Sequence, residues 1–167
     1  DEQTKTQIET MLAGNARVAI PIDTRELKRG DSTSFGIGIK NTDADNTHFL
    51  VELRDEKQGS FIPLYNPQQE TYDVGCADGS CYVNGYTEDG YSNEAVMSYT
   101  IGRSGKITVE VNDDDTILLA AGINREAPRG HYILNIDVCS NSEEYSYGDH
   151  CSSDNLYSGT VQKVHII

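Results

Sequence analysis

The sequence has little basic charge and no long apolar run. Of its 167 residues, 13 are Lys or Arg and 27 are Asp or Glu, which gives a formal net charge of −14, and tryptophan is absent. Because so acidic a surface repels phosphate backbones, nucleic acid is not an expected partner. No apolar stretch is long enough to span a bilayer, so we expect any membrane attachment to come through a segment outside this sequence. The motif Asn-x-Ser/Thr is also absent, which excludes N-glycosylation at that motif.

Four cysteines fall into two short-range pairs, Cys76 with Cys81 and Cys139 with Cys151. Their neighbours are mostly Gly, Ser, Asp and Tyr, which is the composition of loops. Disulfides within each pair are the expected use of these cysteines, and they imply an oxidising, extracellular or cell-surface location. The two other pairings and four free thiols are the alternatives, whereas the spacings do not match those of a zinc ribbon.

Alternating apolar and polar residues predict β-strands through most of the chain. Within residues 33–41, large apolar side chains alternate with Gly36 and Gly38, and glycines at such positions indicate a close approach of another segment or a bulge. About seven or eight short strands with turns between them predict an all-β, Ig-like antiparallel β-sandwich. The predicted strands are 17–22, 33–41, 48–54, 95–101, 106–111, 116–123, 131–139 and 157–167.

One helix is expected at the N-terminus, within residues 1–15, where Ile8, Met11 and Leu12 lie at helical spacing before a Gly-Asn pair. A helix of about 12 residues is marginal on its own. We therefore expect this segment either to dock on the domain as a helix or arm, or to be the lower end of a longer helix. The remaining residues, 16–167, are expected to form the single sandwich domain.

Residues 55–94 interrupt the strand pattern with prolines, glycines and the first cysteine pair. They lack the apolar mass for a core of their own, so we interpret them as a disulfide-clipped insertion on the sandwich. Residues 61–65 are expected to form a short edge strand, since proline is tolerated there. Asn84 and Gly85 predict a β-hairpin with a type I′ turn, because that turn needs positive φ angles.

Two blocks of sequence carry a family resemblance. The first, from Lys28 to Thr42, joins a Gly-Asp turn to an alternating strand that ends in Asn, and the second, from Ala127 to Val138, places Pro-x-Gly-x-Tyr before alternating apolar residues. Together they resemble Ig-like domains of prokaryotic, archaeal-type cell-surface proteins, in which Tyr132 would be a tyrosine corner. A polar helix before a sandwich is also similar to pilin-like filament subunits, and that resemblance implies self-assembly with the β-rich head facing outward.

The patterns of common catalytic sites are missing. No Gly-x-Ser-x-Gly motif occurs, and the stretch from Gly102 to Lys106 fails as a phosphate-binding loop because Thr100 and Ile107 replace required residues. The four histidines show no metal-ligand spacing. We therefore do not expect an enzyme, although abundant carboxylates leave an extracellular hydrolase as a third hypothesis.

Acidic turns and tyrosine-rich loops are the candidate binding sites. Oxygen ligands at alternate positions are typical of calcium sites, and a solvated acidic turn is the alternative. The candidate calcium ligands are Asp43, Asp45, Asp113 and Asp115. Tyrosines among Asn, Ser and Gly provide adaptable contact surfaces, with tight packing on the sandwich as the alternative. The candidate contact residues are Tyr82, Tyr86, Tyr91, Tyr145 and Tyr147.

Two functional hypotheses follow. The first is a non-enzymatic extracellular structural or adhesive domain, the outward-facing part of a pilus-like filament or surface-layer subunit that self-assembles by strand-edge pairing or donor-strand insertion. The second is a secreted ligand- or glycan-binding module that uses the Tyr/Asp-rich loops, with calcium as its cofactor. The tripeptide Arg29-Gly30-Asp31 is interpreted as turn chemistry rather than as an integrin motif.

Overall fold

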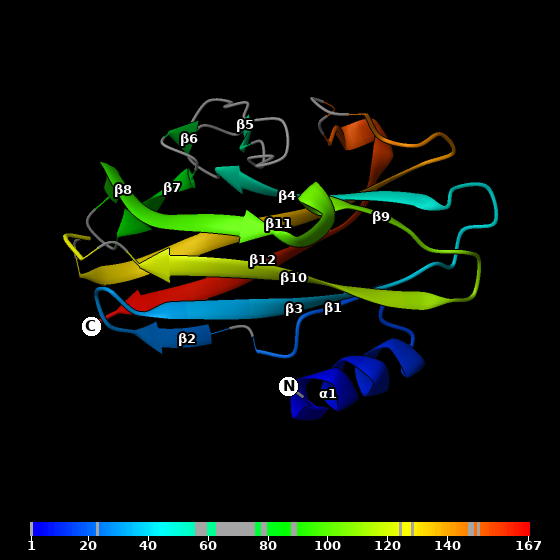
Figure 1. Cartoon of the computed structure of the whole chain (residues 1–167), viewed down its shortest axis with the longest axis horizontal. Helices are drawn as coiled ribbons and strands as arrows, with labels where there is room; N and C mark the ends of the chain where they lie inside the picture. The colour runs from blue at the N-terminus through cyan, green and yellow to red at the C-terminus, as the bar shows by residue number, and fades with distance from the viewer. Residues whose placement is uncertain are drawn as a thin grey trace.

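Two β-sheets pack face to face, and one helix lies on the outside of the first sheet (Figure 1). The computed structural model describes residues 2–22, 24–55, 60–62, 76–77, 80–87, 90–123, 125–127, 129–146, 149 and 151–167. The predicted all-β sandwich with a short N-terminal helix is confirmed. No helix among these residues is long and apolar enough to cross a membrane.

The first sheet has the strand order β1-β3-β10-β8-β7-β6, and all of its neighbouring strands are antiparallel. In that order the bounds are β1 Val18–Ala19, β3 Ser32–Lys40, β10 Asp114–Ile123, β8 Gly90–Ile101, β7 Ser80–Thr87 and β6 Cys76–Ala77. The central pair, β3 with β10, runs the length of the sandwich (Figure 1).

The second sheet has the order β2-β12-β11-β4-β5, and β9 also pairs with β4. Its strands are β2 Thr24–Leu27, β12 Leu156–Ile166, β11 Gly130–Asn141, β4 His48–Asp55, β5 Ser60–Ile62 and β9 Lys106–Thr108. The pair β2 and β12 is parallel, whereas the others are antiparallel. Two short 3₁₀ helices, η1 Gly102–Gly105 and η2 Ser153–Asn155, precede β9 and β12.

The connectivity follows the immunoglobulin scheme. The neighbours β1-β3-β10-β8 in one sheet and β4-β11-β12 in the other correspond to strands A-B-E-D and C-F-G of that fold. Near its N-terminus the chain passes from the first sheet, where β1 lies, to the second sheet, where β2 lies. The strand predicted over 17–22 is only Val18–Ala19, and the unpredicted β2 then joins the other sheet. Pro21 explains the break, because proline cannot donate to a strand ladder.

The main core lies between the two sheets. Phe35, Ile37 and Ile39 of β3 are fully buried against residues such as Phe49 and Val51 of β4. Burying a side chain of this size stabilises a fold by about 1.5–3 kcal/mol. The alternation in the sequence correctly identified these inward-facing residues.

The helix α1, Glu2–Ala13, forms a separate layer with its own small core. Ile8 and Leu12 are buried against Ala19, while Met11 is 39% exposed. A Cβ atom on Gly38 would lie 2.2 Å from Cγ2 of Ile8, so the absence of a side chain lets the helix sit directly on β3. The predicted close approach at Gly38 and the predicted docking of the helix are confirmed.

The strand count and the hairpin within residues 55–94 need correction. Strands β7 and β8 extend the first sheet through β10, so the described chain has more strands than the seven or eight expected. Asn84 and Gly85 lie inside β7 at a shift in register with β8, and the hairpin closes between Thr87 and Gly90. An extra residue can be absorbed as a bulge in a strand, and glycine favours that geometry as well as a turn. The division into residues 1–15 and 16–167, and the insertion itself, stay predictions.

Candidate functional site

Three loops meet at one end of the sandwich, on the right of Figure 1. We call this the acidic end, which comprises residues 41–47, 109–115 and the described residues among 142–155 (142–146, 149 and 151–155), because these segments contain two, four and four Asp or Glu residues and no Lys or Arg. The first follows β3, the second leads into the first two residues of β10, and the third lies between β11 and β12, so the antiparallel register brings them together. All four predicted calcium ligands lie in the first two segments.

Asn41 fixes the first two loops to each other. Its side chain is fully buried and its Nδ2 donates hydrogen bonds to the carbonyl oxygens of Asn46 at 2.9 Å and Val109 at 2.8 Å. Its backbone N–H donates to the carbonyl of Asp113, and its own carbonyl accepts from the N–H of Asn112. A buried amide with these partners stabilises the loops, because each lost partner would leave a desolvated polar group.

The carboxylate of Asp43 closes a turn within its own loop. The backbone N–H of Asp45 and the side chain of Asn46 each donate to it at 2.9 Å. The hydrogen bond from Asp45 is the largest contribution that lowers the pKa of Asp43. At the start of β10, Asp115 accepts hydrogen bonds from the N–H of Thr116 and from Arg103 at 3.0 Å. These contacts give both carboxylates a structural use.

The described residues contain no group of three or more His, Cys, Asp or Glu side chains arranged to hold a metal ion. Asp43 with Asp45 and Asp113 with Asp115 are thus on neighbouring loops without forming a recognisable cage. A calcium ion bound at this end would need further oxygen ligands, such as backbone carbonyls or water. The calcium site stays a prediction.

Tyr157 holds the same end from the second sheet. Its hydroxyl donates to the carbonyl oxygen of Lys40 at 2.5 Å and accepts from the N–H of Thr42 at 3.1 Å. The guanidinium of Arg17 lies 3.8 Å over the ring, and the ring of Phe49 meets it edge-on with centroids 5.0 Å apart. Burial by itself raises the pKa of Tyr157, but the hydrogen bonds and Arg17 reverse this and lower it overall. The ring therefore joins the two sheets where the polar loops begin.

A hydroxyl-to-backbone contact of this kind was expected from Tyr132 as a tyrosine corner. The side chain of Tyr132 lies outside the described part of the structure. Tyr157 makes a comparable link, but it does so from the start of β12 rather than from β11. The sequence did not single out Tyr157, because a tyrosine at a strand start looks like many others.

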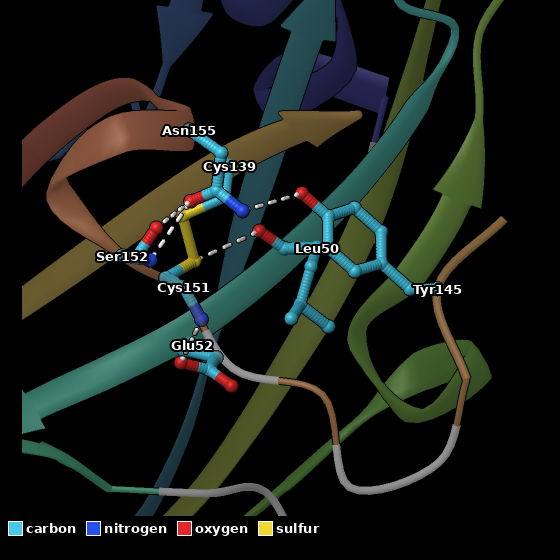
Figure 2. Close-up of a disulfide and its surroundings, with 7 residues drawn as sticks. All are labelled: Leu50, Glu52, Cys139, Tyr145, Cys151, Ser152 and Asn155. Carbon is cyan, nitrogen blue, oxygen red and sulfur yellow. Dashed lines mark hydrogen bonds between the residues drawn. A yellow bond between two sulfur atoms is a disulfide. The ribbon is translucent and has the colours of Figure 1, made fainter. Parts of the chain in front are cut away.

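A disulfide fastens the third loop, residues 142–155, to the second sheet (Figure 2). It joins Cys139, near the end of β11, to Cys151, as predicted, and the two cysteines are 12 positions apart in the sequence. Leu50 and Tyr145 pack against the two cysteines as a small buried cluster. Closing a loop of this size stabilises a fold by about 3 kcal/mol.

Tyr145 belongs to that cluster and is not a free contact residue. It is buried, and its hydroxyl accepts a hydrogen bond from Nδ2 of Asn155 at 3.3 Å (Figure 2). Burial raises the pKa of Tyr145 to about 12, with smaller contributions from the charges of Asp149 and Glu52. Most of its ring is thus packed in the disulfide cluster, although Tyr145 also lines the cavity described below, and its role in binding stays a prediction.

The other predicted site residues are described in part. The backbones of Cys76 and Cys81 lie opposite each other in the pair β6 and β7, which is compatible with a cross-strand disulfide, although their side chains lie outside the described part. Tyr82 and Tyr86 lie on β7 and Tyr91 on β8, within strands rather than loops, and their side chains also lie outside it. Tyr147 is outside the described residues.

Sequence reasoning missed two buried carboxylates on the outer face of the second sheet. Glu52 is 2% exposed and Asp137 is 3% exposed, and the two residues are opposite each other on β4 and β11. The backbone N–H of Cys151 donates to Oε2 of Glu52 at 3.0 Å. A signal was available, because Asp137 precedes Cys139 by two positions and so shares the face that a disulfide-closed loop would cover.

A small cavity opens beside the disulfide cluster. Its volume is about 120 Å³. The residues that line it are His48, Phe49, Arg103, Lys106, Ile107, Thr108, Glu144 and Tyr145. Nδ1 of His48 lies 3.1 Å from the hydroxyl of Thr108, so these two groups are already in contact. Such a cavity has room for a small polar group.

No protein-family model matches the chain, and no curated protein matches its sequence. Solved structures with similarity include a family 123 glycoside hydrolase from Clostridium perfringens, at 13% identity and a TM-score of 0.43, covering 98% of this chain and 25% of that one. The E. coli chaperone DraB is similar at 10% identity and a TM-score of 0.43, covering 89% of this chain and 53% of that one. The class 5 fimbriae chaperone CfaA has 11% identity, a TM-score of 0.37 and coverages of 88% and 54%. The chain thus spans about a quarter to a half of these proteins, and the likeness concerns the fold alone.

Proposed function

We propose that the chain is a non-enzymatic structural or adhesive domain outside the cell, the outward-facing part of a cell-surface filament or surface-layer subunit that self-assembles. The Cys139–Cys151 disulfide supports an extracytoplasmic location, because such bonds persist in oxidising compartments. The observation that carries the proposal is an open strand edge on the first sheet.

The open edge belongs to β3. The N–H of Ile123 donates to the carbonyl of Asp31, so the odd-numbered residues of β3 exchange hydrogen bonds with β10. The backbone groups of the even-numbered residues therefore point to the other side. On that side β1 pairs only with the C-terminal end of β3, and the last paired residues are Gly38 and Ala19. Within the described chain, Ser32 and Ser34 are exposed and have no strand on that side, whereas Gly36 is buried near α1. Arg25 of β2 reaches the neighbouring Thr33, to whose hydroxyl it donates at 2.7 Å.

An edge with unpaired N–H and C=O groups is a template for another strand. A segment from a second copy can add to it by main-chain hydrogen bonds, as in strand addition generally. Ser34 is exposed, so a strand approaching the edge does not have to displace a core residue. The edge therefore supplies a side-to-side contact between subunits.

Replacing Ser34 with proline tests this contact. Proline removes the outward N–H but leaves the ladder to β10, so the fold should persist while side-to-side association is lost. Ser34→Ala, which keeps the N–H, is the matched control. Light scattering and negative-stain electron microscopy at increasing protein concentration should show side-to-side association for the parent and Ser34→Ala, and not for Ser34→Pro. Equal assembly by all three chains rules out this edge, and a parent that stays monomeric at millimolar concentration contradicts the proposed function.

A second candidate function is a ligand- or glycan-binding module. It is favoured by the cavity of about 120 Å³, where Glu144 and Tyr145 of the third loop meet Arg103 and Lys106. A glycan array probed with and without calcium tests it. Binding that Arg103→Ala weakens would support this function, and silence in both conditions would count against it.

A further inference from the structure

The end of the sandwich opposite the acidic end carries positive charge. We call it the basic end, residues 28–31, 125–127, 129 and 167, on the left of Figure 1 where the C-terminus is marked. Backbone hydrogen bonds hold these segments together: the N–H of Gly30 donates to the carbonyl of Ile123, and the N–H of Ile167 donates to that of Leu27. The turn that contains Arg29-Gly30-Asp31 is thus part of a composite surface.

Four exposed cations gather on the basic end: Lys28, Arg29, Arg125 and Arg129. They are four of the 13 Lys and Arg residues in the whole sequence. Three of them, together with the side chain of Ile167, line a cavity of about 390 Å³. Within the described chain, none of the four forms an ion pair. Their charges are therefore available to a partner.

The acidic end presents the complementary surface. Asp45, Glu110, Asp113 and Asp114 are exposed there. Val111, which lies between these acids in the second segment, is 43% exposed. The basic end has the matching feature, since Ile167 is 44% exposed beside its cations. Each end thus combines an excess of one charge with one exposed aliphatic side chain, and the four cations of the basic end outnumber its two exposed acids, Asp31 and Glu126.

The two ends are far enough apart to act independently. Strand β3 begins at the basic end and finishes at the acidic end, and its nine residues span about 30 Å. The Debye length at 0.1 M salt is about 10 Å, so the charges of one end are screened from those of the other. A chain with a net charge of −14 therefore has a local site for an acidic partner.

We propose that the basic end of one copy receives the acidic end of a second copy, so that chains stack head to tail. Carboxylates around Glu110 and Asp113 meet the cations around Arg29 and Arg129, while Val111 enters the cavity floored by Ile167. Contacts between two different patches repeat without closing, which produces an open filament. The inference rests on the proposed self-assembly and adds the direction of growth, since the β3 edge joins subunits side to side.

Complementary charge reversals test the stacking. The double variant Arg29→Glu with Arg129→Glu has acidic charge at both ends. The double variant Glu110→Lys with Asp113→Lys has basic charge at both ends. Light scattering at about 20 mM NaCl should show that each variant alone needs about tenfold or more protein to associate than the parent. An equimolar mixture of the two should recover association, because the opposite ends match again.

Two further variants serve as controls. Lys163→Glu adds negative charge at an exposed residue of β12 outside the segments of both ends, and it should associate like the parent. Arg29→Gln with Arg129→Gln removes charge without adding any, and it should give an intermediate loss with an unchanged circular dichroism spectrum.

The outcomes separate this inference from the proposed function. If the charge-reversal variants of the two ends assemble like the parent while Ser34→Pro does not assemble, head-to-tail stacking is overturned and the proposed structural role is retained. If the parent and the equimolar mixture of the two variants both stay monomeric, head-to-tail stacking and the proposed self-assembly are both overturned. A mixture that fails to recover association, while each variant alone is impaired, also overturns the stacking, because lost charge complementarity is then not the cause.

Discussion

Glycine 38 shows how a single residue decides the position of a whole element. The strand β3 uses its large side chains to fill the core, and the glycines between them leave the outer face flat enough for α1. Because a Cβ on Gly38 would lie 2.2 Å from Cγ2 of Ile8, even alanine cannot be accommodated without moving the helix. The helix is too short to persist alone, so its order depends on this contact.

Replacing Gly38 with alanine should therefore displace α1 and leave the sandwich folded. Overpacking of this kind costs about 1–3 kcal/mol. Hydrogen exchange should show faster exchange for the amides of α1 and unchanged protection in β10. Ile8→Ala removes the clashing methyl group, so the double variant with Gly38→Ala should lose less stability than the two single changes add up to. Additive losses would show that the helix does not sit on Gly38.

Among the elements, the loop of residues 142–155 depends on its disulfide cluster. Cys151 anchors it to Cys139 and, through its N–H, to Glu52. Tyr145 and Leu50 lie to one side of the bond in Figure 2 and belong to the same buried cluster. This packing keeps the phenol away from water, and it makes the loop sensitive to alkaline pH.

Stability should fall between about pH 10 and pH 12 because of Tyr145. The pKa of an unfolded tyrosine is about 10, and in the folded chain burial raises that of Tyr145 to about 12. The contribution is complete below pH 10 and is lost as the pH rises toward 12, since the unfolded chain ionises first. Urea unfolding at several pH values should show a shallower decline for Tyr145→Phe than for the parent. Tyr157→Phe is the control and should not flatten the curve, because the pKa of Tyr157 is lowered. If stability declines equally with pH for the parent and Tyr145→Phe, the phenol of Tyr145 is exposed to water in the folded chain and the prediction is wrong.

The elements that the sequence predicted well are those with a strong local pattern. Alternation placed β3, β4 and β11 close to their observed bounds, because one face of each strand is buried in the core. Residues 116–123 were placed from a run of apolar residues, as for a strand covered on both faces, but β10 buries one face only. The two-residue strands β1 and β6 have no such pattern, since tertiary pairing alone defines them. Asn84-Gly85 misled the prediction because a glycine that fits a hairpin turn fits a bulge equally well.

The candidate site was harder to predict than the fold. The acidic loops and the Cys139–Cys151 pair were visible in the sequence, because their residue types are distinctive. The role of Asn41 in joining two loops was not visible, since its side-chain partner Val109 lies 68 positions away. The basic end was invisible for the same reason: Arg29 and Arg129 become neighbours only through the register of two sheets.

At the scale of the whole molecule, net charge opposes the compact state. Twenty-seven acidic side chains face 13 basic ones, and the described ion pairs, such as Arg103 with Asp115 at 3.0 Å, are exposed and contribute little. Self-repulsion should therefore exceed the attraction of these pairs, most of all at the acidic end. The same charges that destabilise the single chain guide the stacking of one chain on another.

Salt should consequently have opposite effects on folding and on assembly. Raising NaCl from about 20 mM to about 500 mM shortens the Debye length several-fold, which weakens repulsion within the chain and attraction between the ends. A gain of about 1 kcal/mol corresponds to a rise in melting temperature of about 2–4 °C for a chain of this size. Calorimetry should show that rise while light scattering falls. Glu110→Gln with Asp113→Gln should melt higher than the parent at low salt and respond less to added salt, since part of the repulsion is already gone. A melting temperature that falls with salt would mean that attractive pairs, not repulsion, dominate the surface of this chain.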